Sequence, residues 1–258
     1  MSDATPDFDG RLSVVVPVRD ERENVATLLA EIHEALAGLG ELEVLYVDDG
    51  SRDGTAEALV EACARYPRLR VVRHSEVCGQ SAALRSGVRA ARFPWVATLD
   101  GDGQNDPRDL PALLALVSPG RRAPGLELVA GHRVTRRDTW LRRLSSRVAN
   151  GVRSWLLGDR TPDTGCGLKV FGRDFFLALP YFDHMHRFLP ALALREGGGV
   201  VSVPVSHRPR AAGRSKYGVG NRLWVGIVDL LGVAWLQRRM RRPVLAPPPG
   251  GGARAPSR

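Results

Sequence analysis

Short apolar runs alternate with longer amphipathic segments through the first hundred residues. The apolar runs are rich in Val and Leu, which is typical of strands buried on both faces of a sheet. They cover residues 12–18, 42–49, 69–74 and 95–100. The segments between them have helical spacing and end near Gly or Pro, at residues 23–39, 55–66 and 79–93. This order predicts an α/β fold with a mostly parallel central sheet flanked by helices and right-handed crossovers.

The alternation loosens after residue 110. The later segments read as a short helix, a strand with its exit loop, a basic helix and a Gly-rich turn, at 111–117, 126–133, 139–157 and 163–171. A mixed segment continues to residue 210. We expect one domain over residues 11–220 and an amphipathic C-terminal helix over 221–242. The flanking residues 1–10 and the Pro/Gly-rich tail 243–258 are expected to be disordered.

Composition and charge narrow the class of protein. The chain has 258 residues, of which 43% are hydrophobic and 25% charged, so it can bury a core of ordinary size. Its formal net charge of +9 favours an anionic partner such as nucleic acid, acidic lipid or a phosphorylated substrate. It carries no zinc-ligand spacing, helix-turn-helix or interleaved basic and aromatic pattern, so nucleic acid is not an expected partner.

The cysteines and the hydropathy of the chain indicate the cellular compartment in which the protein is expected. The three cysteines, Cys63, Cys78 and Cys166, form no CxxC pair, which fits a reducing compartment better than a disulfide framework. The acidic N-terminus does not resemble a secretory signal, and the apolar run 223–236 is too short to span a bilayer. Cys166 is expected to pack in the core. His74, His132 and His207 are expected to make polar contacts rather than take part in catalysis.

Polar clusters follow three of the predicted strands at their carboxyl ends. In a parallel sheet these ends share one edge, where ligands bind. "VRDERENV", "DDGSRDGT" and "DGDGQNDP" are the clusters. The third crowds Asp100, Asp102 and Asp106 together, and like charges this close repel each other unless a cation lies between them. A solvated turn without a ligand is the plain alternative.

Two familiar aspartate motifs do not fit the third cluster. An EF-hand loop would need Gly at the position of Asn105 and Glu at the position of Pro111. A phosphatase nucleophile motif of the haloacid-dehalogenase type would follow the first strand, with Thr or Val in place of Gln104. A hard divalent cation held on a diphosphate therefore explains the carboxylates best.

Six blocks of the sequence together resemble glycosyltransferase family 2, whose members are inverting enzymes with the nucleotide-sugar (GT-A) fold. The blocks run in family order over roughly residues 11–220: "VVVPVRDERENV", "VDDGSRDGT", "DGDGQNDP", "GHR", "DTGCGLKVF" and "RAAGRSKYG". Within the family, they are most similar to the branch of dolichol-phosphate mannosyltransferases and polyprenyl-phosphate glycosyltransferases. One Asp-x-Asp motif would be weak support, but six ordered blocks are specific.

The resemblance implies a donor site that binds a nucleotide-sugar. Residues implied at the nucleotide are Pro17, Arg19, Glu21, Asp48, Asp49, Ser51 and Asp100. Among them, Asp49 is the expected contact to the base or ribose. Asp100, Asp102 and Gln104 are implied as ligands of Mg²⁺ or Mn²⁺ on the donor diphosphate.

The resemblance also implies an acceptor site. Arg133 and Arg142 would reach an acceptor phosphate, and Arg210, Ser215 and Lys216 would close over the phosphates. Asp163 would lie near the transferred sugar. The residues expected to carry catalysis are therefore Asp102, Arg133 and Asp163.

The residue types favour a phosphate as acceptor. A phosphate monoester is mostly a dianion at pH 7, so it can attack an anomeric carbon without a general base if cations surround it. A sugar hydroxyl would need a carboxylate base, for which Asp163 is the one clear candidate. We expect metal-dependent, inverting transfer of a hexose, mannose from GDP-mannose, onto a polyprenyl phosphate. Alternatives are a UDP-glucose or UDP-aminosugar donor, a polysaccharide hydroxyl as acceptor, a non-catalytic relative, or a basic nucleic-acid-binding protein.

The C-terminal helix has two interpretations. Trp224 and Trp235 lie near its ends, and an arginine cluster follows at 238–242. It either packs on the core or lies in a membrane interface, with the arginines at anionic lipid. The expected partners are accordingly a membrane surface and a membrane protein. The expected location is the cytoplasm, peripheral on the inner face of the cytoplasmic membrane.

Overall fold

The computed structural model describes residues 5–134, 151–209 and 220–241, and within it the chain forms a seven-stranded sheet in the order β3-β2-β1-β4-β6-β5-β7. The first four strands pair in parallel, as the sequence predicts. They are β1 (Arg11–Val18), β2 (Glu41–Asp49), β3 (Leu69–His74) and β4 (Trp95–Thr98). The intervening helices are α1 (Arg22–Ala35), α2 (Thr55–Arg65) and α3 (Gln80–Ala90). The predicted fold class is confirmed.

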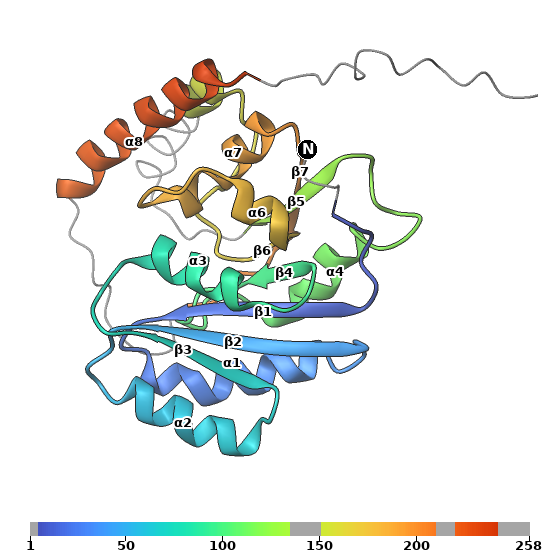
Figure 1. The fold of residues 1–258 in the computed structure, drawn as a ribbon, viewed down its shortest axis with the longest axis vertical. Helices are drawn as coiled ribbons and strands as arrows, with labels where there is room; N and C mark the ends of the chain where they lie inside the picture. The colour runs from blue at the N-terminus through green and yellow to red at the C-terminus, as the bar shows by residue number, and fades with distance from the viewer. Residues whose placement is uncertain (1–4, 135–150, 210–219, 242–258) are drawn as a thin grey trace, which may run out of the picture.

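Helices cover both faces of the sheet. Figure 1 shows α1 and α2 on one face, with α3 on the other. Each face has its own apolar core, with Tyr46 on the α1 and α2 side and Leu45 on the α3 side. Neighbouring residues of β2 therefore pack into the cores on opposite faces of the sheet, because successive side chains of a strand point to opposite sides.

The second half of the chain adds three strands to the sheet. These are β5 (Leu126–Arg133), β6 (Lys169–Gly172) and β7 (Gly199–Val205). The accompanying helices are η1 (Pro107–Asp109), α4 (Leu110–Ala115), α6 (Arg173–Ala178), η2 (Met185–Arg187) and α7 (Leu189–Arg195). Residues 151–157 are also helical.

One sequence-based prediction is wrong here. Residues 163–171 were expected to form a Gly-rich turn, but their end belongs to β6, which runs antiparallel between β4 and β5. The sheet is therefore mixed rather than parallel throughout. A strand of four residues at the end of a Gly-rich block is too short to show an alternating pattern.

The last helix, α8 (Gly220–Arg239), lies on the outside of the molecule beyond α7 (Figure 1). One side of it buries Val233 and Ala234, and Gln237 Nε2 donates to the carbonyls of Leu157 and Ala191 at 3.0 and 3.2 Å. The opposite side exposes a row of apolar residues, the α8 stripe. It consists of Trp224, Ile227, Val228, Leu231 and Trp235.

One face of α8 packs on the domain, as the first interpretation expects. The other face is uncovered, which leaves an apolar surface of the kind that the second interpretation requires. No helix in the described ranges is long and apolar enough to cross a membrane.

Candidate active site

The loop after β4 is shaped by its own side chains. Asn105 Oδ1 accepts from the Asp100 backbone N–H at 3.1 Å, and Asp102 Oδ1 accepts from the Gln104 backbone N–H at 3.1 Å. Asp106 caps η1 by accepting from the backbone N–H of Arg108 at 3.0 Å. The three aspartates therefore make different contacts, and the carboxylate of Asp106 is used to cap a helix.

The carboxyl of Asp100 lies in a closely fitted space. Gln80 Nε2, at the start of α3, donates to its Oδ1 at 2.8 Å. On the other side is Gly167, where an added Cβ would lie 2.3 Å from the Asp100 carboxyl carbon. Burial of the carboxyl and then the charge of Asp102 raise the pKa of Asp100 to about 6, although Lys169 opposes them. A divalent cation would relieve this cost by favouring the ionised form.

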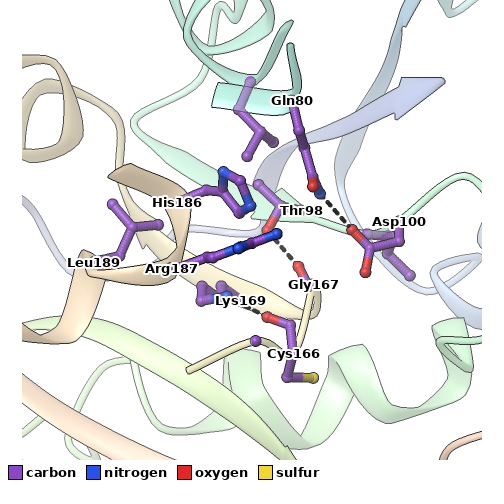
Figure 2. Close-up of a pocket in the computed structure, with 12 residues that line it drawn as sticks. Gln80, Thr98, Asp100, Cys166, Gly167, Lys169, His186, Arg187 and Leu189 are labelled. Atoms are coloured by element: carbon purple, nitrogen blue, oxygen red, sulfur yellow. Dashed lines mark hydrogen bonds between the residues drawn. The ribbon is translucent and has the colours of Figure 1, made fainter. Parts of the chain in front are cut away.

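A cavity of about 170 Å³ opens beside Asp100 (Figure 2). It is lined by residues from α3, the end of β4, the turn before β6 and η2, including Gln80, Asp100, Gly165, Lys169, His186 and Arg187. Lys169 is buried and its Nζ donates to the Cys166 carbonyl. Burial lowers the pKa of Lys169. The cavity thus combines a carboxylate with cationic and neutral polar groups.

Arg133 and Asp163 form an ion pair next to this cavity. Arg133 Nε and Nη2 donate to the two carboxylate oxygens of Asp163 at 2.6 and 2.9 Å. Burial is the largest effect and lowers the pKa of Arg133, but the hydrogen bonds and charge of Asp163, with the charge of Asp100, together outweigh it and raise the pKa of the guanidinium. A Cβ on the cavity-lining Gly165 would lie 3.4 Å from Arg133 Nη2, which places the pair at the cavity margin.

Asp49, predicted to bind the nucleotide, is held by the neighbouring strand and loop. Its carboxylate accepts from the backbone N–H groups of Cys78 and Gly79 at 2.9 and 2.8 Å. His74 Nδ1 lies 2.8 Å from Asp49 Oδ1. The adjacent Asp48 is fully buried and accepts from the Ser51 backbone N–H at 2.9 Å, so it shapes the turn after β2.

The other residues predicted at the nucleotide join two loops. Ser51 Oγ accepts from the backbone N–H of Asp20 at 2.9 Å, which links the loop after β1 to the loop after β2. Glu21 Oε2 accepts from Asn24 Nδ2 at 2.7 Å, and Arg19 Nε lies 3.9 Å from Asp20 Oδ2. Pro17 is half-buried in β1, beside this junction. The predicted group therefore converges on one sheet edge, although each role remains a prediction.

Gln104 points toward a different segment from Asp100. Its Nε2 lies 3.4 Å from the Arg208 carbonyl oxygen and 3.5 Å from His207 Nε2. This contact joins the aspartate loop to the chain after β7. Four other predicted site residues, Arg142, Arg210, Ser215 and Lys216, lie outside the described residues.

Several residues at the site were not singled out from the sequence. These are Gln80, Gly167, Lys169 and Arg187. Lys169 and Gly167 had a signal, because both lie in the "DTGCGLKVF" block. His186 belongs to "HMH" at 184–186, where two histidines one residue apart suggest at most a metal pair. Its place at this cavity depends instead on Ser81 Oγ, which lies 2.8 Å from its Nδ1 across 105 positions of sequence.

The residues around Asp100 fit a hard divalent cation. Asp100 and Asp102 supply oxygen donors, which such ions prefer. The absence of a side chain on Gly167 leaves room for the Asp100 carboxyl.

The decisive comparison is with a family profile. The profile described as glycosyl transferase family 2 matches residues 13–177, which run from within β1 to within α6 and include the Asp100 loop. The chain belongs to glycosyltransferase family 2.

Two curated relatives resemble this glycosyltransferase over most of its length. The first is the dodecaprenyl-phosphate galacturonate synthase of Rhizobium johnstonii, 35% identical over 90% of this chain and 69% of the relative. The second is the undecaprenyl-phosphate 4-deoxy-4-formamido-L-arabinose transferase of Edwardsiella ictaluri. It is 34% identical over 81% of the glycosyltransferase, which spans 63% of that relative's length.

Solved structures share the fold of the glycosyltransferase. The glucosyl-3-phosphoglycerate synthase of Mycobacterium tuberculosis, in complex with Mn²⁺, UDP and glucosyl-3-phosphoglycerate, superposes with a TM-score of 0.68. The match has 18% identity and covers 90% of this chain and 81% of that one. A mannosyltransferase of Pyrobaculum calidifontis, in complex with GDP-mannose and Mn²⁺, gives a TM-score of 0.61 at 22% identity, covering 93% and 68%.

Proposed function

We propose that this glycosyltransferase moves a sugar from a nucleotide diphosphate to the phosphate of a polyprenyl lipid. The carrying observation is that Asp100 lines one cavity together with Lys169 and Arg187. The Arg133–Asp163 pair lies beside Gly165 at the margin of this cavity, so a carboxylate and cations are close to one space. The names of both curated relatives specify a polyprenyl phosphate, which supports a lipid phosphate as acceptor.

Asp100 and Asp102 are the proposed ligands of Mn²⁺ or Mg²⁺, with Gln104 as a third. The ion, when bound, neutralises charge on the departing diphosphate. Two solved structures with this fold contain Mn²⁺ together with a nucleotide, which supports the proposal. Gln80 holds Asp100 by a hydrogen bond of 2.8 Å, so the carboxylate is oriented in advance.

Arg133 is the proposed contact to the acceptor phosphate. A guanidinium has five N–H groups, and the two bonds to Asp163 leave others to bind a phosphate oxygen. Asp163 fixes the orientation of Arg133 and, in our proposal, lies near the transferred sugar. Arg142, Arg210, Ser215 and Lys216 are proposed to neutralise the remaining phosphate charge.

The proposed reaction is a single displacement. A phosphate oxygen of the acceptor attacks the anomeric carbon, and the bond from that carbon to the diphosphate oxygen breaks. The configuration inverts, and no proton has to be removed because the acceptor is a dianion. Asp49 is proposed to hold the base or ribose, with Pro17, Arg19, Glu21, Asp48 and Ser51 framing it.

The donor sugar is the finer part of the proposal. The sequence favours mannose from GDP-mannose, whereas the relatives are named for galacturonate and 4-deoxy-4-formamido-L-arabinose. The relatives therefore favour a sugar other than mannose. A panel of GDP-mannose, UDP-glucose and UDP-galacturonate compares these donors directly.

The test incubates purified protein with undecaprenyl phosphate and each labelled donor, with Mn²⁺ or with EDTA, and then extracts the lipid. We expect label in the lipid from one donor and none with EDTA. Asp102→Asn should lower transfer at least about 100-fold, because even indirect disturbance of a metal ligand costs 10–100-fold. Asp174→Asn, at an exposed carboxylate on α6, is the matched control and should retain transfer.

Each result has a separate meaning for the proposal. Full transfer in EDTA or by Asp102→Asn would contradict the metal assignment. Label that appears only on an added sugar hydroxyl would contradict the phosphate acceptor.

The α8 stripe is proposed to rest on the surface of the membrane that holds the lipid acceptor. Two indole rings lie on it, with Trp224 and Trp235 exposed by 68% and 58%. Arg238, Arg239 and Arg241 are exposed at and just after its C-terminal end. Apolar and aromatic side chains flanked by arginine suit an anionic lipid interface.

A further inference from the structure

The ends of β2 and β3 carry a second group of metal-binding side chains. Asp49 and His74 are the last residues of the two strands and pair directly in register. Cys78 follows in the loop that leads to α3. The ligand atoms of these three residues all lie within 4.8 Å of one another.

Backbone hydrogen bonds hold the loop against the Asp49 carboxylate. The N–H of Cys78 donates to Asp49 Oδ1 at 2.9 Å, and the N–H of Gly79 donates to Oδ2 at 2.8 Å. The residue that carries the thiol is therefore fixed to the residue that carries the carboxylate. The Cys78 thiol itself lies 3.5 Å from the Glu76 carbonyl oxygen.

The imidazole of His74 is also oriented from its far side. Its Nε2 lies 2.9 Å from Ser86 Oγ on α3, while Nδ1 faces Asp49. When Nε2 carries the proton and donates to Ser86, the lone pair of Nδ1 points toward Asp49 and is available to a cation. Histidine ligands of metals are commonly held by such a partner on the other ring nitrogen.

The burial of the three groups suits a site that opens to solvent. The side chains of Asp49 and His74 are only 6% and 14% exposed, so little water competes for them. Cys78 is exposed and is not in a disulfide. A cation can therefore enter from the side of the thiol.

We propose that Asp49, His74 and Cys78 bind a borderline-soft divalent cation, with Zn²⁺ as the best match. One sulfur, one nitrogen and one oxygen ligand form a typical zinc set, and a tetrahedral ion would keep one open position. A thiolate disfavours the hard ions Mg²⁺ and Mn²⁺, which prefer the oxygen ligands Asp100 and Asp102. Binding releases the Cys78 thiol proton to solvent, and the thiolate and carboxylate charges balance the ion.

The site has a regulatory consequence, which rests on the proposed function. Asp49 is the proposed contact to the nucleotide, so a cation on this residue competes with the donor. Zn²⁺ should therefore inhibit transfer under conditions in which Mn²⁺ supports it. Two metals with different ligand preferences would then act in opposite directions on the same reaction, Mn²⁺ supporting transfer and Zn²⁺ inhibiting it.

The binding test uses Co²⁺ as a spectroscopic probe on the full chain. A cobalt–thiolate bond gives a charge-transfer absorption band in the near ultraviolet, and added Zn²⁺ removes it by displacement. We expect a band that saturates at one Co²⁺ per chain, is absent in Cys78→Ser and is at least about tenfold weaker in apparent affinity in His74→Gln. Circular dichroism checks that each variant is folded.

Two matched control variants test whether the cobalt band comes from the Asp49, His74 and Cys78 site. Cys63→Ser removes a partly exposed thiol on α2, and Asp102→Asn removes a proposed Mn²⁺ ligand. Both should retain the band. A folded wild-type chain without a band would overturn the proposal, as would a band that persists in Cys78→Ser.

The regulatory part is tested separately from the function. With an active donor, Zn²⁺ should inhibit the wild type at least about tenfold more strongly than Cys78→Ser at saturating Mn²⁺. Equal inhibition of both would overturn the competition with the donor while leaving the cobalt result intact. If no donor is active, the cobalt band still decides whether the metal site exists.

Discussion

Asp100 occupies a space that admits no side chain on Gly167. The carboxyl lies where a Cβ on that glycine would come within 2.5 Å of three of its atoms, far inside ordinary contact. The glycine is therefore required for its small size and not for an unusual backbone angle. The position of a proposed metal ligand is thus set by a residue in the turn before β6. Thr98 Oγ1, at the end of β4, holds this turn by donating to the Gly167 carbonyl across 69 positions of sequence.

Gly167→Ala should displace the Asp100 carboxyl and weaken Mn²⁺ binding by about tenfold or more, since supporting contacts of a metal ligand have this effect. Titration calorimetry with Mn²⁺ in the presence of a nucleoside diphosphate measures it. Gly165→Ala is the matched control, because its Cβ would meet Arg133 Nη2 only at 3.4 Å. Unchanged Mn²⁺ affinity in a folded Gly167→Ala protein would contradict the steric argument.

His186 makes the folded protein sensitive to acid. Burial, and then the positive charges of Arg187, Lys169 and His184, lower the pKa of His186 well below 6.5. The unfolded chain takes up this proton near pH 6.5 while the folded chain does not, so stability falls as pH drops below that value. The slope cannot exceed about 1.4 kcal/mol per pH unit for one proton.

Urea unfolding between pH 7 and 5 should show this loss in the wild type and a smaller loss in His186→Asn. Asn is neutral throughout the range and can still accept a hydrogen bond from Ser81. The control His184→Asn changes the neighbouring, partly exposed histidine and should keep the wild-type slope. Identical slopes in the wild type and in His186→Asn would show that another group causes the acid sensitivity.

The sequence predicts some site residues and not others for a physical reason. Asp49 and Asp100 follow apolar strands, and the rule that strand ends share an edge brings them to the cleft. The pairing of Arg133 with Asp163 has no such signal, because it depends on where β6 enters the sheet. The contact of His74 with Asp49 likewise depends on strand register, which alternation in sequence does not specify.

At the scale of elements, the parallel half of the sheet follows from the sequence and the mixed half does not. β1 to β4 alternate with helices of ordinary length and carry polar clusters or turns at their ends, so their order and direction are nearly forced. β6 has four residues, and its partners β4 and β5 are far away in sequence. Helix ends were also overestimated, since α1 ends at Ala35 and residues 36–38 form a turn.

The packing of α3 on the sheet depends on a glycine. A Cβ on Gly87 would lie 2.4 Å from Val15 Cγ1 and 2.9 Å from Val47 Cγ2. Gly87→Ala should therefore lower the free energy of unfolding by about 1–3 kcal/mol, the usual cost of overpacking. Gly226→Ala in α8 is the matched control, because no atom lies within 4 Å of its added Cβ.

The control should be neutral or stabilise by up to about 1 kcal/mol, since alanine favours a helix over glycine. Chemical denaturation of both variants measures the difference. If Gly87→Ala were as stable as Gly226→Ala, α3 would not be held as close to β1 and β2 as the structure shows.

At the scale of the whole molecule, apolar surface gathers on one outer helix. The α8 stripe lies beyond α7, on the far side of the domain from α1 and α2 (Figure 1). Trp155, which is 84% exposed, belongs to the 151–157 helix whose Leu157 carbonyl accepts from α8. Exposed patches of this kind mark interaction surfaces. The net charge of +9 makes an anionic surface the favoured partner.

Leu231→Glu should reduce binding to vesicles of phosphatidylglycerol by about tenfold or more, because losing a buried leucine costs about 2 kcal/mol and 1.4 kcal/mol corresponds to tenfold. Vesicle cosedimentation measures it. Val60→Glu places the same charge on an exposed apolar residue of α2 and should bind like the wild type. Equal loss in both variants would assign binding to net charge rather than to the α8 stripe.

The position of β6 also sets an order of events while the chain is being made. β4 pairs with β1 early, but its other edge has no partner until residues 169–172 emerge, and Thr98 waits for Gly167 across 69 positions. At about 5–20 residues per second, that edge stays open for several seconds of synthesis. β5 emerges first and must not close onto β4, because the slot between them belongs to β6. An edge of β4 that lies inside the finished sheet is thus open in the nascent chain, and we expect chaperone contact and misassembly there.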